Sequence, residues 1–166
     1  MVHLRSLFGA SIAPLRDTDW DRMSDYAQAF ARAGLRTGPA QQYAALTRVG
    51  RMGKEFGAIM RDFDILVCPT TAIPAIEATF NHETDNLRIN GCDVHPLLGW
   101  VLTVPFNMLS SAPVLSVPMV RAANSVPFGL QFVERPFDVD SVFRAALAFE
   151  DARGLWFQTP DDKPHT

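Results

Sequence analysis

Side chains that could take part in nucleophilic catalysis are few in this sequence and lie far apart. The adjacent serines Ser110 and Ser111 stand in the run Leu109–Ala112, with no glycine beside them to form an oxyanion cradle. The two lysines are Lys54, inside a long predicted helix, and Lys163, in a polar tail. The simplest interpretation of both lysines is a solvated surface charge. We therefore predict no catalytic residue in this chain.

Histidines and cysteines form no recognisable site either. His3, His82, His95 and His165 are scattered along the chain. His82 and His95, in a central loop region, could approach a substrate, but a surface position is the simpler interpretation. Cys68 and Cys92 form no CxxC pair and have no histidine at metal-ligand spacing, so two reduced thiols are favoured over a disulfide. We find no Ser-His-Asp order and no GxSxG elbow, and we predict neither a metal nor a cofactor.

Composition points to an ordinary globular domain. The chain has 166 residues, of which 48% are hydrophobic and 20% charged, and its net charge is −3. This charge gives no general attraction to nucleic acid or to an anionic membrane. No long apolar run follows the first residues, so we expect no secretory signal and a cytoplasmic location. The uncharged segment Leu97–Val120 is long enough to span a bilayer, but it contains three prolines. We interpret this segment as buried strand and loop.

Hydrophobic spacing predicts an α/β layer structure. Helices are expected at Asp17–Gly34, Pro39–Arg61 and Val139–Arg153, and strands at Asp64–Cys68, Val114–Val117 and Gly129–Val133. The strands have apolar residues on both faces, which is typical of strands covered on both sides. The region 70–98 reads as mostly loop. Asp138 is expected to cap the last helix and Gly154 to end it. The inner face of that helix is predicted to consist of Val139, Val142, Phe143, Ala146, Leu147 and Phe149.

Three segments, taken in order, resemble the amidase signature family. The first is Phe63–Thr71, and the second is Thr103–Asn107 followed by Ala112–Pro118. The third is Val126–Val133, which leads through a Pro-Phe-Asp turn into the final helix. Their order and spacing are also similar to those of the family, so the resemblance spans roughly residues 15 to 155.

The resemblance implies that this chain is the carboxy-terminal section of a larger enzyme. Members of the family hydrolyse amides with a serine nucleophile, a second serine at a cis peptide bond and a lysine base. These residues belong to a Gly/Ser-rich amino-terminal half that has no counterpart here. We therefore expect residues 1–158 to form a carboxy-terminal section of the amidase-signature domain, and 159–166 to form a polar tail. The implied fold is a partial one, a layered mixed sheet flanked by helices.

The same resemblance suggests substrate-binding residues. It places Trp100, Thr103, Val104, Phe106 and Asn107 along one wall of an acyl pocket. Family members that use glutamine have an acidic residue at the position that resembles Trp100. An indole cannot pair with an ammonium group, so an apolar or aromatic amide is the expected substrate. For Thr103 and Asn107 we favour a second role, in which a buried side chain ties the loop to the sheet.

Two functions remain open at this stage. In the first, the chain supplies scaffold and a pocket wall to an amidase and is inactive alone. Its partner would then be the missing amino-terminal half or, without that half, another copy of itself. In the alternative, the chain is a non-catalytic remnant that acts as a binding or interaction module. Neither hypothesis involves nucleic acid or a membrane.

Overall fold

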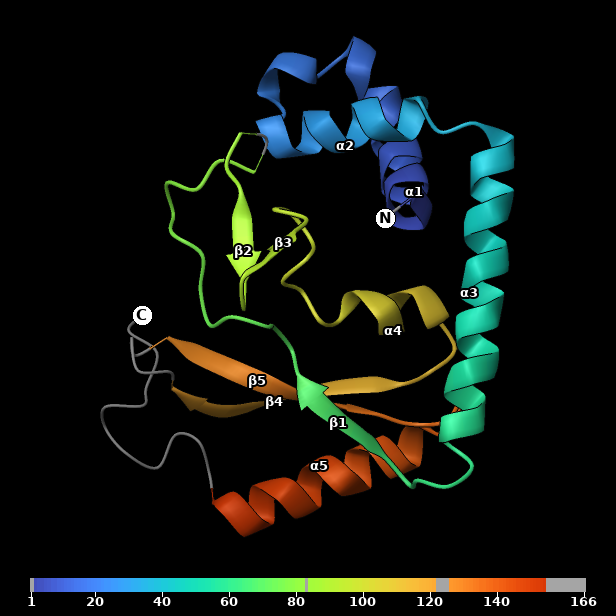
Figure 1. Cartoon of the computed structure of the whole chain (residues 1–166), viewed down its shortest axis with the longest axis vertical. Helices are drawn as coiled ribbons and strands as arrows, with labels where there is room; N and C mark the ends of the chain where they lie inside the picture. The colour runs from blue at the N-terminus through green and yellow to red at the C-terminus, as the bar shows by residue number, and fades with distance from the viewer. Residues whose placement is uncertain (1, 83, 122–125, 155–166) are drawn as a thin grey trace. The chain divides into compact units, whose positions relative to one another are not determined.

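A computed structural model describes residues 2–82, 84–121 and 126–154 (Figure 1). The chain divides into two compact units, Met1–Phe56 and Gly57–Thr166. The first unit is helical, and the second contains strands and helices, so the predicted α/β class is confirmed. The predicted tail, 159–166, lies outside the described residues. No described helix is both long enough and apolar enough to cross a membrane.

The first unit is built on a close helix pair. Helix α1 (Val2–Ile12) is followed by two short 3-10 helices, Ala13–Asp17 and Trp20–Arg22, and by helix α2 (Asp25–Leu35). Gly9 of α1 lies directly against Phe30 and Gly34 of α2, where a β-carbon would overlap their backbone atoms. A residue without a side chain is therefore required at the point where α1 and α2 cross.

The predicted helix from Asp17 to Gly34 begins later than expected. Ser24 is the true N-cap, since its hydroxyl accepts a hydrogen bond from the Ala27 amide at 3.3 Å. Before it, the chain folds back, and the Gln28 side chain donates to the Trp20 carbonyl at 2.9 Å. The sequence also offers Asp17, Thr18 or Asp19 as a cap, but none of them caps α2, and the serine was overlooked. Helix α1 was not predicted.

The long helix α3 (Pro39–Ile59) agrees closely with the prediction. It runs across the division between the two units. Within the described helix α3, Phe56 is buried, while Tyr43, Leu46 and Ile59 are exposed. These three large apolar side chains of α3 are therefore uncovered in this chain.

The second unit contains a three-stranded antiparallel sheet. Strand β5 (Pro127–Val133) lies between β1 (Leu66–Pro69) and β4 (Val114–Arg121). Val133 stands opposite Leu66 on one side and opposite Val114 on the other. Among the described residues, β1 and β4 are both edge strands. The expectation that all three strands lie in the middle of a covered sheet is therefore met only by β5 within this chain.

Strand β4 accommodates a proline in its interior. The pairing of β4 with β5 shifts register between Pro118 and Val120. Proline has no amide to donate to a ladder, so it is tolerated in edge strands and at such irregularities. Gly129 of β5 is opposite, and a β-carbon there would stand 2.9 Å from the Val117 carbonyl oxygen. A glycine at the start of a strand suggests either a close backbone approach or a bulge, and the structure shows a close approach at Gly129.

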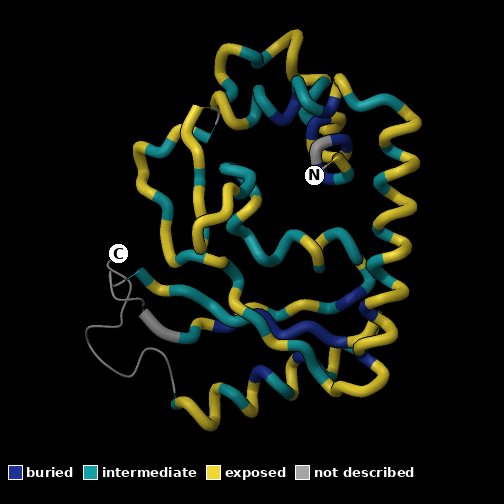
Figure 2. Tube along the Cα trace, viewed as in Figure 1, coloured by how far each residue is buried: buried dark blue, intermediate teal, exposed yellow. Residues whose placement is uncertain are grey.

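Helix α5 (Val139–Arg153) covers one face of this sheet. Val142 and Ala146 pack with Val117 and Phe132 in the core of the unit. Buried positions recur along β5 and at intervals along α5 (Figure 2). The Asp138 cap is confirmed, because its carboxylate accepts from the Ser141 amide at 3.1 Å.

Half of the predicted inner face of α5 is wrong. Val139, Phe143 and Leu147 are exposed, while Val142 and Ala146 are buried and Phe149 is half-buried. At 100° per residue, the first three positions lie on the flank of the helix that the sheet does not reach. The sequence shows one broad apolar face, and only the sheet determines which part of it is buried.

A two-stranded hairpin and a short helix were also missed by the sequence interpretation. Strands β2 (Leu87–Ile89) and β3 (Cys92–Val94) form a hairpin in the region expected to be loop. Asn90 and Gly91 turn it with φ values of 51° and 79°, as a two-residue type I′ turn requires. Helix α4 (Val104–Leu109) lies inside the segment expected to be strand and loop. Its proline stands in the first turn, where the missing amide costs nothing.

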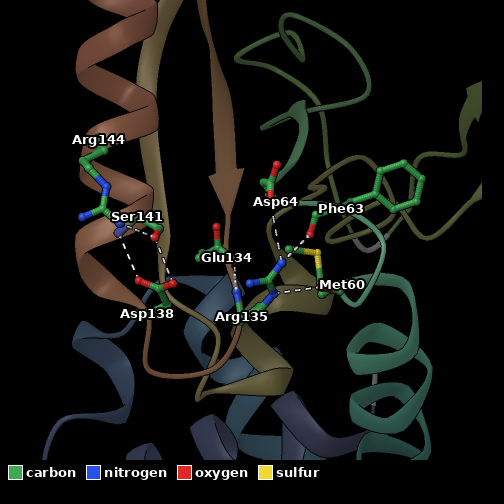
Figure 3. A network of polar contacts seen from close by, with 8 residues as sticks. All are labelled: Met60, Phe63, Asp64, Glu134, Arg135, Asp138, Ser141 and Arg144. Carbon is green, nitrogen blue, oxygen red and sulfur yellow. Dashed lines mark hydrogen bonds and ion pairs between the residues drawn. The ribbon is translucent and has the colours of Figure 1, made fainter.

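The turn from β5 to α5 is held by a polar network (Figure 3). Arg135 donates to the carbonyls of Met60 at 2.8 Å and Phe63 at 3.1 Å, just beyond the end of α3. Its own amide donates to the carboxylate of the buried Glu134 at 2.7 Å. A cation is favourable next to the free carbonyls at a helix end, so Arg135 joins this turn to the chain that enters β1.

Candidate pocket wall

Three segments distant in sequence meet beside the carboxyl end of β1. The Thr70 amide donates to the Gly129 carbonyl at 2.9 Å, which extends the pairing of β1 with β5. The Leu102 amide then donates to the Thr70 carbonyl, and the Ala72 amide to the Trp100 carbonyl, at 2.9 and 2.8 Å. The chain from Trp100 to Leu102 is thereby fixed to the sheet through the segment that follows β1.

Gln131 closes this junction from the centre of the sheet. Its side chain is fully buried, and Nε2 donates to the carbonyls of Pro69 at 2.9 Å and Leu102 at 3.1 Å. Carbonyl oxygens only accept, so the amide must present its nitrogen to both. A glutamine inside a strand is more often a structural hydrogen-bonding residue than a ligand, and these two contacts give Gln131 that structural role.

Cys68 lies opposite Gln131 in the ladder. Burial raises the pKa of the Cys68 thiol, and a hydrogen bond with Gln131 opposes the shift only in part. A thiol with a raised pKa stays protonated near neutral pH and is a poor nucleophile. Neither Cys68 nor the exposed Cys92 forms a disulfide.

Trp100, the first of the proposed pocket residues, is half-buried at the junction. Its indole Nε1 is buried and has no hydrogen-bond partner, and the same is true of the Gln131 Oε1 atom. A buried hydrogen-bond donor without a partner is uncommon in the interior of a native protein. Among the described pocket-wall residues, Trp100 is therefore the one with a buried polar atom that has no partner in this chain.

The other four proposed residues continue directly from Trp100 into α4. Thr103 stands at the helix N-cap, but its hydroxyl makes no capping bond. Val104 and Phe106 are half-buried, and Asn107 is exposed. Residues three and four apart share a helix face, so Phe106 and Asn107 lie on the side of α4 that Thr103 begins.

The expectation that a buried Asn107 side chain ties the loop to the sheet is wrong. The segment forms a helix, in which the Asn107 amide donates to the Thr103 carbonyl and the side chain is exposed. Gln131 makes the connection to the sheet instead. Thr103 contributes to the start of the helix through its backbone carbonyl, and its hydroxyl does not cap that helix.

The described residues contain no complete catalytic set. Ser111 donates its hydroxyl to the Leu109 carbonyl at 3.2 Å, and Ser110 is exposed with a φ of 49°. Lys54 is exposed on α3, and Lys163 lies outside the described residues. No group of three or more acidic, histidine or cysteine side chains in the described part could hold a metal ion.

The central histidines support loops. His82 contacts the Pro96 carbonyl through Nδ1 at 3.1 Å, and the His95 Nδ1 accepts from the Leu97 amide at 3.2 Å. These bonds hold the chain that leads toward Trp100. Both rings are half-buried and form hydrogen bonds with the backbone. The expectation that both histidines lie at the surface is therefore only partly correct.

The fold and the junction define a portion of a larger α/β fold. In the three-stranded sheet, one strand is paired on both sides and two strands have an open edge among the described residues. The wall leading into α4 stands without a catalytic centre in the described part. The chain belongs to the amidase family, whose model matches residues 2–142.

Comparison with curated proteins gives the same family. The chain is 33% identical over 108 residues to a glutamyl-tRNA(Gln) amidotransferase subunit from Brevibacillus brevis strain 47, a match that covers 65% of this chain and 20% of that one. It is 32% identical over 113 residues to the corresponding subunit from Bacillus mycoides strain KBAB4, covering 68% and 20%. The chain therefore spans about a fifth of the length of these relatives.

Solved structures share the fold. A bacterial aryl acylamidase of the amidase signature family aligns with a TM-score of 0.70 at 24% identity, over 89% of this chain and 31% of that chain. A second structure, described as an amidase, aligns with a TM-score of 0.71 at 21% identity, over 90% and 34%. These likenesses show that the present chain folds as one portion of an amidase-signature protein.

Proposed function

We propose that this chain is the carboxy-terminal portion of an amidase that cleaves carbon–nitrogen amide bonds by a Ser-Ser-Lys mechanism. It supplies scaffold and one wall of the acyl pocket, and it is inactive without an amino-terminal section that carries the serines and the lysine. Residues 1–158 are the amidase section of the chain and 159–166 are a tail. The partner is that amino-terminal section, and the compartment is the cytoplasm, where two free cysteines remain reduced.

The observation that carries this proposal is the junction around Gln131. The fully buried side-chain amide of Gln131 holds the Trp100–Leu102 segment to the sheet through hydrogen bonds to the Pro69 and Leu102 carbonyls. A site that must present a wall to a substrate needs such rigid support, because small displacements of positioning groups weaken catalysis. The segment supported in this way leads directly into every other residue that we propose for substrate contact.

The proposed substrate is an apolar or aromatic amide. Trp100 and Phe106 bring large apolar surfaces, and Val104 adds a smaller one. None of the proposed contact residues is charged, so the wall has nothing to pair with the ammonium group of a glutamine substrate. The relatives named as amidotransferase subunits share too little of their length with this chain to determine its substrate.

The experiment is reconstitution of the complete enzyme. The coding region upstream is first searched for a Gly/Ser-rich Ser–Ser motif and a lysine, and that section is then expressed together with this chain. Hydrolysis of aryl or alkyl amides by the joint product, and none by either part, is the expected result. A soluble joint product that hydrolyses no amide would refute the proposed function and favour the non-catalytic binding module.

A further inference from the structure

Helix α5 carries a second apolar stripe that the sheet does not cover. Val139, Phe143 and Leu147, here called the α5 stripe, are spaced four residues apart and therefore line one side of the helix. Their exposed fractions are 49%, 52% and 58%. Single exposed apolar residues need no explanation, but three in one row form a contiguous surface.

The α5 stripe is separate from the face that α5 already uses. Val142 and Ala146 are buried against the sheet, and the Phe149 ring lies 5.6 Å from the Phe132 ring. At 100° per residue, the stripe lies on the flank beside this buried face. Exposed charges such as Asp140 and Arg144 occupy the side opposite the sheet. A helix that is apolar over so wide an arc is typical of one packed on two sides.

An exposed aromatic residue stands at the start of the same helix. Phe137 is 84% exposed and has a φ of 70°, a conformation that bulky residues rarely adopt. Its amide donates to the Ser111 carbonyl at 3.0 Å, which holds the turn in this form. Backbone strain at an exposed aromatic residue is tolerated where the surrounding structure fixes it. A further exposed apolar side chain therefore stands two residues before the stripe in the sequence.

The size of the α5 stripe favours one packed element over a second folded chain. Three partly exposed side chains amount to a few hundred Å², whereas a stable dimer buries about 800 Å² on each partner. One helix or strand is sufficient to cover such a row. The chain spans 20% of its relatives and about a third of the solved neighbours, so most of the amidase fold lies outside it.

We propose that the α5 stripe is the docking surface for an apolar helix or strand from the part of the amidase fold that this chain lacks. The proposal rests on the proposed function for the identity of the partner. It assigns to α5 two packing faces, one for the sheet of this chain and one for the amino-terminal section. The section that brings the catalytic residues would then be held partly at a helix that makes no contact with substrate.

The test is capture of a defined probe by the full chain. The probe is the Brevibacillus brevis relative without the segment that this chain matches, or the upstream section of the same gene where it exists. The combined variant Val139→Ser, Phe143→Ser and Leu147→Ser should bind the probe at least tenfold more weakly than the unmodified chain. Circular dichroism and the thermal midpoint establish that this variant is folded. Phe143→Lys alone serves as a second variant that perturbs less of the helix.

The matched control is Phe63→Ser. The Phe63 side chain is 61% exposed and lies off the α5 stripe, so the same change of residue type should alter binding by less than twofold.

Equal capture of the stripe variant and the unmodified chain would overturn the proposal, as would the absence of any capture. Loss of a homodimer with no loss of capture would instead assign the stripe to a second copy. Amide turnover of the captured complex is scored separately: capture through the stripe without turnover refutes only the proposed function.

Discussion

Gln131 donates its side-chain amide to the carbonyl of Leu102, 29 residues earlier in the chain, at 3.1 Å. The same nitrogen donates to the Pro69 carbonyl, so a single buried side chain joins β5, the end of β1 and the segment that leads to α4. Both acceptors lose this donor if the amide is replaced. The position of the proposed pocket wall therefore depends on one residue of the central strand.

Replacement of Gln131 should be strongly destabilising. Gln131→Met and Gln131→Glu both remove the donor and leave two carbonyls unpaired at a buried site, at a cost of about 2–4 kcal/mol. Chemical denaturation, followed by far-UV circular dichroism, measures the loss in the free energy of unfolding. Gln42→Met on α3, where the side chain is only half-buried, is the control and should change the free energy of unfolding by less than about 0.5 kcal/mol. Similar stability of the Gln131 and Gln42 variants would contradict the assigned role.

The isolated chain should hydrolyse neither amides nor esters above background. The described residues hold no activated nucleophile, since Ser111 bonds to a backbone carbonyl and Lys54 lies exposed on α3. Turnover is measured with pure protein and aryl amide or ester substrates. Activity that disappears in Ser110→Ala or Ser111→Ala would show that this chain contains its own nucleophile.

Trp100→Asp should impair a reconstituted enzyme by well over tenfold in kcat/KM for aryl or alkyl amides. The change replaces an apolar wall with a charge that such a substrate cannot pair, and a half-buried carboxylate is costly to desolvate. Trp20→Asp, in the first unit, is the control for loss of an indole elsewhere. Unchanged substrate preference in Trp100→Asp would place the pocket somewhere else.

The lone chain should self-associate at high concentration. Strands β1 and β4 each have one unpaired edge among the described residues, and Val67 and Val114 on them are 45% and 37% exposed. Open edges with apolar side chains promote pairing with other chains, and edge lysines suppress it. Light scattering should show that Val67→Lys with Val114→Lys lowers the apparent mass. A monodisperse 18.4 kDa monomer for the unmodified chain would show that this portion is autonomous.

The cap of α5 should make stability depend on pH in the acid range. Hydrogen bonds from the Ser141 side chain and amide lower the pKa of Asp138, and Arg144 and Arg135 add to the effect. A carboxylate with a lowered folded-state pKa contributes stability above its unfolded pKa, near 4, and loses it as pH falls through the folded value. Asp138→Asn should therefore lower the thermal midpoint at pH 7, and the difference from the unmodified chain should shrink below pH 4. Asp140→Asn, exposed in the same helical turn, is the control. A difference that persists at pH 2 would refute the electrostatic part of this account.

Local signals were sufficient for several elements. Helix α5 was predicted with its bounds, because Asp138 and Gly154 mark its two ends. Helix α3 was placed to within two residues at its end, and all three sheet strands were located. The hairpin at Asn90 and Gly91 was missed although its turn dipeptide is a strong local signal. Helix α4 was missed because prolines in Leu97–Val120 were weighed as helix breakers, whereas Pro105 stands in a first turn.

By itself the sequence determined the family, the absence of the Gly/Ser-rich catalytic loop, and the residue types along the proposed wall, since these depend only on the identity and order of residues. Only the tertiary structure decided which apolar side chains are covered. Val142 and Phe143 are neighbours with similar hydrophobicity, yet the sheet lies against one and leaves the other exposed. Tertiary structure also decided that Gln131, and not Asn107, ties the wall to the sheet. Packing contacts and long-range hydrogen bonds form between residues tens of positions apart in the sequence. No local sequence pattern shows which of these residues come close together.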